Sequence, residues 1–223
     1  MNPLLLFFYC FFMLLPCAWL CYGPFTENLS RSKKKVSAEC AVISFFISLL
    51  CFPLVHIFGT GGADITGFIY MSVSFFYFRK TVNEGFHKLL FVFIVVAHFA
   101  SIISGIRYTV CIYLNLPVSL EEATSLFFFI DYFLRITLYP VMWMVLRRWF
   151  APRLKQIDSQ NMKGLWLIPL IFFILGLFTW PHYNPASSDE NLIFLSAFFV
   201  LSVPSFPVYI LLLKILDNTA KNT

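Results

Sequence analysis

Apolar stretches long enough to cross a lipid bilayer recur along the whole chain. A transmembrane helix needs about 20 mostly apolar residues to span the hydrocarbon core. Hydrophobic residues make up 60% of the 223 residues and charged residues only 12%, whereas a soluble domain has roughly 25% charged residues. A soluble fold of this size could not cover so much apolar surface. The sequence therefore predicts an all-α integral membrane protein, with the lipid bilayer as its first partner.

Hydropathy divides the chain into six clear spans and one weak span. The clear spans are Pro3–Tyr22, Cys40–Phe58, Leu89–Ile112, Ser125–Leu146, Gly164–Trp180 and Asn191–Leu213. The weak one is the third, Ile65–Phe78, which crosses only if the preceding small residues Gly59–Ala63 enter the bilayer with it. We therefore expect about seven transmembrane helices in one domain, residues 1–214, followed by the start of a cytoplasmic connector helix at 215–223.

Positive charges predict which way the chain crosses the membrane. Of the 16 Lys and Arg residues, four follow the first span, three the third and five the fifth, and two lie in the C-terminal tail. The loops on the other side hold none and contain acidic residues such as Glu121 and Glu122. Because cytoplasmic loops retain Lys and Arg, we expect the N-terminus outside and the C-terminus in the cytoplasm. This alternation requires the third segment to cross, and the net charge of +5 then indicates no nucleic-acid partner.

Three charged residues lie inside predicted spans, where each needs a partner or a function. Asp131 and Arg135 are four residues apart, so they share one face of the fifth span. Arg107 lies in the fourth span. The short outer loop between these two spans places it at a depth similar to that of Asp131. We expect a network in which one carboxylate lies between two guanidinium groups.

This network would keep an excess positive charge, because one carboxylate neutralises only one of two guanidinium groups. Guanidinium groups bind carboxylates through paired hydrogen bonds. An extracellular peptide or a small anionic ligand could therefore bind at Arg107, Asp131 and Arg135. The alternative is a structural ion pair, with the second Arg bonded to backbone carbonyls or extended towards the membrane surface. The sequence leaves both interpretations open.

Other polar residues in the spans are candidates for lining a cavity at this depth. They are His56, His98 and Tyr108. His98 precedes Arg107 by nine residues and so lies on the opposite side of the fourth span; a lone histidine there more often packs than binds a ligand. Small residues around Gly105 offer a surface for close helix approach. We find no metal-ligand spacing and no catalytic motif, and we predict no metal, cofactor or catalytic residue.

The stretch that joins the fifth and sixth spans carries a recognisable pattern. Arg147–Leu154 (RRWFAPRL) leaves the fifth span, and Gly164–Phe173 (GLWLIPLIFF) enters the sixth. The pattern resembles the N-terminal transmembrane sensor region of bacterial GHKL-type sensor histidine kinases, a group that includes peptide-pheromone receptors. The resemblance covers mainly residues 125–223. The cytoplasmic signalling loop that it implies includes Pro152, Arg153, Trp166 and Pro169.

The resemblance implies a membrane sensor of a two-component system in a bacterial plasma membrane. Such a module would bind an extracellular signal and relay it to a cytoplasmic kinase or response partner, with a homodimer as its expected state. Histidine kinase activity would require a further C-terminal domain, because these residues contain no kinase motif. The competing function is that of a small-solute transporter or a substrate-binding membrane subunit. A structural subunit without a ligand is the third.

Overall fold

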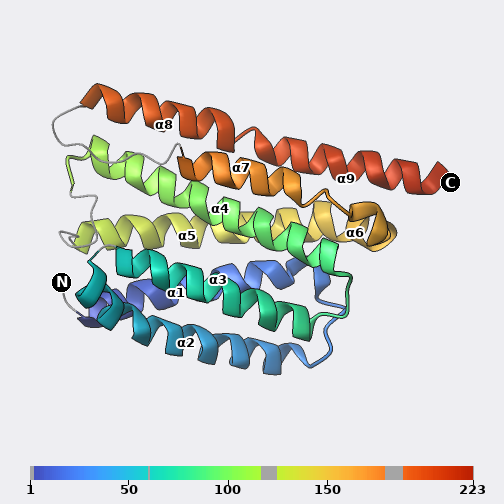
Figure 1. Cartoon of the computed structure of the whole chain (residues 1–223), viewed down its shortest axis with the longest axis horizontal. Helices are drawn as coiled ribbons and strands as arrows, with labels where there is room; N and C mark the ends of the chain where they lie inside the picture. Colours follow the sequence, from blue (N-terminus) through green and yellow to red (C-terminus); the bar gives the residue numbers. More distant parts are fainter. Residues whose placement is uncertain (1–2, 60, 117–124, 179–187, 223) are drawn as a thin grey trace.

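The chain folds into a bundle of helices that run along one common axis (Figure 1). The computed structural model describes residues 3–59, 61–116, 125–178 and 188–222. Within these ranges the one pairing of extended backbone is an isolated antiparallel bridge between Leu29 and Val82. The helical elements are α1 (Pro3–Tyr22), η1 (Gly23–Phe25), α2 (Lys33–Phe58), α3 (Gly61–Thr81), α4 (Phe86–Tyr113), α5 (Ser125–Val145), η2 (Leu146–Phe150), α6 (Ala151–Gln156), η3 (Gln160–Met162), α7 (Leu167–Phe178), α8 (Ser188–Ser202) and α9 (Ser205–Asn222).

Five helical segments in the described part of the chain are long and apolar enough to cross a membrane. They are Leu4–Phe25, Lys33–Phe58, Phe86–Tyr113, Ser125–Gln156 and Leu195–Leu216. The predicted all-helical, multi-pass membrane fold is therefore confirmed. The third and sixth predicted spans form α3 and α7, which lie alongside the longer helices (Figure 1). The count of seven crossings and the orientation stay predictions. The predicted end of the sixth span at Trp180 lies outside the described residues, as do Glu121 and Glu122.

Most of the helices differ in length from the predicted spans, and three of the differences bear on how the chain crosses the bundle. α3 has 21 residues because it begins at Gly61 rather than Ile65 and ends at Thr81 rather than Phe78, which gives it a length of about 31 Å. α5 continues through the π-helical turn η2 into α6, so this helical segment reaches Gln156. The last predicted span is divided into α8 and α9 at Val203 and Pro204, because proline lacks the amide hydrogen that a continuous helix needs.

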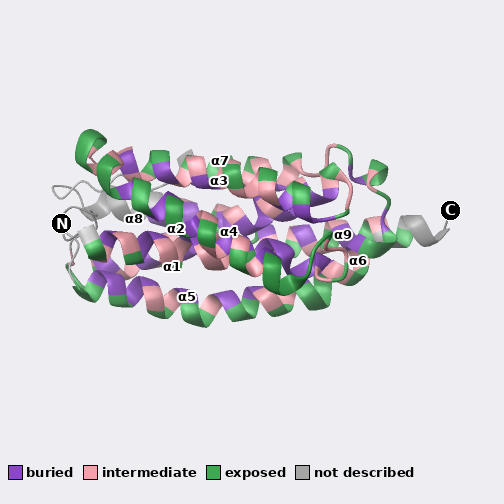
Figure 2. Cartoon of the chain, turned by 90° about the horizontal axis from the view of Figure 1, so that it is seen from below, coloured by how far each residue is buried: buried purple, intermediate pink, exposed green. Residues whose placement is uncertain are grey.

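Large apolar side chains lie on the outside of the bundle as well as in its core. Phe68, Phe76 and Ile136 are each at least 70% exposed. Figure 2 shows exposed residues along the outer faces of the helices and buried residues between them. An apolar surface of this extent is unfavourable in water and is suited to contact with lipid. All six cysteines are free thiols and five of them are buried, where they pack as small apolar side chains.

The segments that follow α1, α3 and α5 meet at one end of the bundle. Asn83 N, after α3, donates to Asn28 O, after α1, at 2.8 Å. Lys155 of α6 forms an ion pair with Glu27. These contacts join the loops that follow the first, third and fifth predicted spans. Each pair of helices that these loops connect therefore reverses direction at the same end.

α4 and α8 approach each other closely at Gly105. A Cβ atom at this position would lie 2.2 Å from Cε1 of Phe198, so only glycine leaves room for the aromatic ring. The sequence predicted that the small residues here would permit close helix approach, and the contact confirms this for Gly105. The position of α8 against α4 is thereby fixed by one large side chain in one small gap.

Candidate functional site

The structure brings Arg107, Asp131 and Arg135 together between α4 and α5. Asp131 Oδ2 accepts a hydrogen bond from Arg135 Nε at 2.6 Å, and Asp131 Oδ1 accepts one from Arg135 Nη2 at 3.1 Å. This bidentate pairing follows from the four-residue spacing on α5. Arg107 Nη1 of α4 lies 3.7 Å from Asp131 Oδ1. One carboxylate therefore faces two guanidinium groups, and it pairs much more closely with one of them.

Arg135 has a partner for each of its three nitrogen atoms. Besides the two bonds to Asp131, its Nη1 donates to Tyr139 OH at 2.5 Å and its Nη2 reaches Ser104 Oγ at 3.4 Å. Tyr139 OH also shares a 3.0 Å hydrogen bond with Cys17 Sγ of α1. Asp131, Arg135 and Tyr139 follow each other at four-residue intervals, so one face of α5 supplies most of the contacts. Arg135 thus joins α1, α4 and α5.

Arg107 is held more loosely than Arg135. Its Nη1 donates to Tyr9 OH of α1 at 2.5 Å. Its guanidinium carbon lies 4.6 Å from the ring centre of Phe127, which is a cation–π contact. Its Nε has no hydrogen-bond partner among the described residues. The positive charge that Asp131 does not neutralise therefore lies mainly on Arg107.

The three charged side chains of the cluster are buried, so the stability of the fold depends on how well their charges are paired. The side chain of Asp131 is 0% exposed, that of Arg135 3% and that of Arg107 9%. An unpaired charge at membrane depth is unfavourable, and the hydroxyl groups and aromatic ring around the two arginines offset part of this cost. An anionic group that reached Arg107 could replace its long contact with Asp131. Reaching Arg135 in the same way would require breaking a bidentate ion pair.

Three other residues, His56, His98 and Tyr108, were predicted to line a cavity near the arginine–aspartate cluster. His98 is fully buried on α4, and its Nδ1 shares a 2.8 Å hydrogen bond with Tyr209 OH of α9. His56 is exposed near the end of α2 and stacks on Phe52 of the same helix. Tyr108 is buried on α4, about 100° around the helix from Arg107. His98 and His56 therefore belong to other parts of the bundle.

The residues of the predicted cytoplasmic loop lie in α6 and at the start of α7. Pro152 is near the first residue of α6. Arg153 Nη1 donates to Trp149 O at 2.6 Å, and its guanidinium carbon lies 5.7 Å from the Trp149 ring centre. Trp166 is half-buried just before α7, and Pro169 is buried in its first turn. Arg153 thus stabilises its own helical segment.

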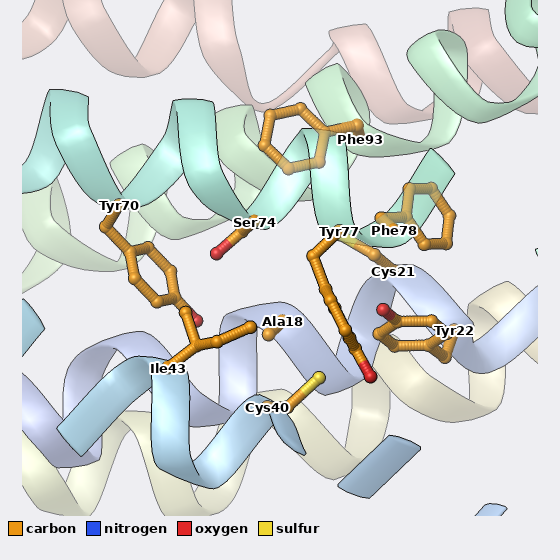
Figure 3. A pocket seen from close by; sticks show the side chains of 10 residues that line it. All are labelled: Ala18, Cys21, Tyr22, Cys40, Ile43, Tyr70, Ser74, Tyr77, Phe78 and Phe93. Carbon is orange, nitrogen blue, oxygen red and sulfur yellow. The ribbon is translucent and has the colours of Figure 1, made fainter. Parts of the chain in front are cut away.

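A small cavity lies among α1, α2, α3 and α4, surrounded by Tyr22, Tyr70 and Tyr77 (Figure 3). It has room for about one water molecule. Its wall is almost wholly apolar, because the tyrosine hydroxyls bond elsewhere. Tyr70 OH donates to Leu14 O at 2.5 Å, and Tyr77 OH donates to a Glu39 carboxylate oxygen. This cavity therefore offers very little polar surface to a ligand and is separate from the arginine–aspartate cluster.

Two tyrosines of the cluster were not identified from the sequence. Tyr139 could have been found, because it follows Arg135 by four residues and so lies on the same helix face. Tyr9 could not, because it precedes Arg107 by 98 residues and α1 is apolar on all sides. Without a polar face, nothing in that segment marks which side chain meets α4.

Comparison with known proteins gives no family for the chain. No family model, no curated protein and no solved structure matches it. In the part that the structure describes, no group of three or more His, Cys, Asp or Glu side chains could hold a metal ion. The chemistry of the cluster is therefore inferred from its geometry. It can hold an anion at Arg107, or it can join three helices as a structural ion pair.

Proposed function

We propose that the chain is a membrane receptor module that binds a small anionic group, such as the carboxylate of a peptide, at Arg107. The observation that carries this proposal is the unequal pairing of the two arginines with Asp131, at 3.7 Å for Arg107 and 2.6 Å for Arg135. Arg107 keeps an excess charge, and its Nε has no hydrogen-bond partner in the part of the chain that the structure describes. A carboxylate could satisfy both through paired hydrogen bonds.

The proposed topology has seven crossings, with the N-terminus outside and the C-terminus in the cytoplasm. The contacts between the segments after α1, α3 and α5 support it, because they require α3 to run from one end of the bundle to the other. Because the loops at that end are rich in Lys and Arg, we expect that end of the bundle to face the cytoplasm. The test is labelling of intact cells with a membrane-impermeant maleimide. Asn115→Cys should react and Lys163→Cys should react only after lysis; the reverse pattern would invert the proposed orientation.

Binding would be relayed to the cytoplasm through α5. A ligand shifts a conformational equilibrium only if it binds two arrangements with different affinities. A carboxylate on Arg107 would loosen the contact between Asp131 and α4 and so change how α5 packs. α5 continues into α6, where Arg153 lies in the stretch that resembles the signalling loop of sensor histidine kinases. A cytoplasmic kinase or response partner in a bacterial plasma membrane is the output that this resemblance favours.

The test uses thermal unfolding of the purified chain in lipid nanodiscs. The probes are acetate and a short peptide with either a free C-terminal carboxylate or a C-terminal amide. A ligand of the folded state raises the melting temperature, so acetate and the free carboxylate should raise it and the amide should not. Arg107→Gln should fold and lose the shift, while Arg79→Gln, which changes an arginine of α3, should keep it. If no carboxylate stabilises the parent chain, the cluster is a structural ion pair.

A small-solute transporter is the second candidate, and the division of the last span into α8 and α9 favours it. Many transporters use discontinuous helices at membrane depth. Sealed proteoliposomes distinguish the two functions. A transporter would accumulate a radiolabelled carboxylate inside the vesicles, whereas a receptor would bind it to saturation without accumulation.

A further inference from the structure

An open groove lies between α2 and α3, at the end of the bundle where α2 begins and α3 ends. Its volume of about 390 Å³ is within the range of ligand pockets, roughly 300–1,000 Å³. Its wall is formed by residues of the two helices and of the loop before α2, which include Arg31, Ala38, Glu39, Val42, Tyr77 and Lys80. The groove is therefore separate from the arginine–aspartate cluster, which α1, α4 and α5 form.

Basic residues outnumber acidic ones around this groove. They are Arg31, Lys33, Lys34, Lys35, Arg79 and Lys80. Ser30 N donates to Thr81 O at 2.9 Å, which holds the segment before α2 against the end of α3 and so brings these charges together. Among the described residues that line the groove, Glu39 is the one acid. The groove therefore has an excess of positive charge.

Glu39 is already engaged, and its contacts leave two basic side chains available. Its carboxylate oxygens accept from Arg31 Nη1 at 2.9 and 3.0 Å, and Tyr77 OH also donates to one of them. Because both bonds from Arg31 use Nη1, the other two guanidinium nitrogens can still donate to a second anion. Among the described residues, no carboxylate forms an ion pair with Lys80. The groove therefore offers Arg31 and Lys80 to an anionic group.

The start of α2 adds to the attraction for an anion. The N-terminus of a helix carries a partial positive charge, which acidic side chains or bound anions stabilise. The first turn of α2 contains no acidic residue and instead begins with Lys33, Lys34 and Lys35. Within the chain this arrangement is unfavourable, and an anion from outside the chain would offset it.

The surface beyond the charges is apolar on both helices. Val42 lines the groove and is exposed, and so is Phe46, one turn further along α2. On α3, Val73 is exposed one turn before Tyr77. These side chains lie further from the basic end of the bundle than Arg31 and Lys80 do. A molecule with a charged head and an apolar tail would cover both parts of this surface, whereas a soluble anion would cover only the first.

We propose that the groove between α2 and α3 binds one anionic phospholipid, with its phosphate at Arg31 and Lys80 and an acyl chain along Val42 and Phe46. Guanidinium groups bind phosphate through paired hydrogen bonds, and basic pockets between transmembrane helices bind lipid headgroups. The lipid would hold α2 against α3 at the end of the bundle that we expect to face the cytoplasm. It uses none of the residues of the proposed carboxylate site, so the two proposals are tested separately.

Native mass spectrometry of the purified chain in detergent tests the proposal. The probes are phosphatidylglycerol and phosphatidylcholine with identical acyl chains. Phosphatidylglycerol should saturate at one molecule per chain and bind several-fold more tightly, because the choline group cancels the phosphate charge. Lys80→Gln should weaken its binding about fivefold, the contribution of one basic residue near a lipid headgroup. Lys214→Gln is the matched control, because Lys214 lies on α9, on the other side of the bundle from α2 (Figure 1).

Ala38→Trp separates binding in the groove from attraction by charge alone. The large side chain should fill the groove without changing any charge, so it should abolish the phosphatidylglycerol site. Ala38 and Lys80 are exposed, so both variants should keep the circular dichroism spectrum of the parent. Unchanged binding to Ala38→Trp would overturn the proposal, and so would equal affinity for the two lipids. Equally tight binding of glycerol 3-phosphate, a headgroup without acyl chains, would overturn it as well.

Discussion

The two sides of α4 carry buried polar groups that are satisfied to different extents. Towards α1 and α5, Arg107 belongs to a cluster in which a carboxylate, hydroxyl groups and an aromatic ring surround the charges. Towards α7, α8 and α9, His98 shares a hydrogen bond with the uncharged hydroxyl group of Tyr209, and its Nε2 has no hydrogen-bond partner among the described residues. An unpaired buried ion costs several kcal/mol, and an unpaired neutral group about 1–3 kcal/mol. The protein therefore supplies its own partners for the buried charges and, in the part that the structure describes, leaves one nitrogen of a histidine without one.

Asp131→Asn should cause the largest loss of stability. It removes the carboxylate and leaves two guanidinium groups buried without a counter-charge, which should cost about 3–5 kcal/mol. Unfolding in detergent, followed by circular dichroism, measures the loss. The control is Glu27→Gln, which neutralises the carboxylate of an exposed ion pair and should have little effect. If both variants unfold at the temperature of the parent, the charges of the cluster are not paired in the folded protein.

Arg135→Gln should destabilise the chain more than Arg107→Gln. Arg135 loses a bidentate bond to Asp131, which should cost roughly 2–4 kcal/mol. Arg107 loses one bond to Tyr9 and a long contact with Asp131, which should cost about 1 kcal/mol. The two variants are compared by the same unfolding measurement. Equal losses would contradict the unequal pairing on which the receptor proposal depends.

Tyr209→Phe should have a smaller effect on the other side of α4. It removes the hydrogen bond between Tyr209 OH and His98 Nδ1, so that Nδ1 keeps only the 3.5 Å contact with Ser205 Oγ. This loss should cost about 1–2 kcal/mol. Tyr113→Phe is the control, because Tyr113 is 85% exposed. A loss as large as that for Asp131→Asn would remove the contrast between the charged and the neutral side.

Glu27→Gln should show the smallest effect, and that effect should depend on pH. The hydrogen bond from Lys155 and its charge lower the pKa of Glu27 below the ordinary value of 4.5. The contribution of the pair to stability is therefore present above that value and is lost as the pH falls through the lowered pKa. Both side chains are largely exposed, so salt should screen the pair. A difference in melting temperature that persists at 1 M salt would contradict this account.

Much of the bundle could be predicted because hydropathy and spacing are local properties. α1 begins and ends at the predicted residues, Pro3 and Tyr22. α4 begins three residues before the predicted Leu89, because a hydropathy window does not register a less apolar helical turn at the end of a helix. The pairing of Asp131 with Arg135 follows from their four-residue spacing on α5, and the proximity of Arg107 to Asp131 was expected from the short loop between the fourth and fifth predicted spans.

The rest depends on which helix faces meet, and local sequence does not encode this in an apolar chain. The hydroxyl groups of Tyr9 and Tyr209 come from helices that are distant in sequence from their partners on α4. Pro204 lies within the last predicted span. Proline can kink a helix or end it, and the choice between them is made by the packing of α8 and α9.

The two halves of the last span are fastened differently, and this gives them different mechanical properties. Phe198 of α8 fits the gap at Gly105 and has no room to slide. α9 is tied to α4 near its start, at Tyr209, and its far end extends beyond the other helices (Figure 1). α9 also packs against α6, with Leu213 only 1% exposed and Leu216 packed on the core. From Leu216 to its end at Asn222 is about 9 Å, so a tilt of about 10° about that point would move the tip by roughly 2 Å.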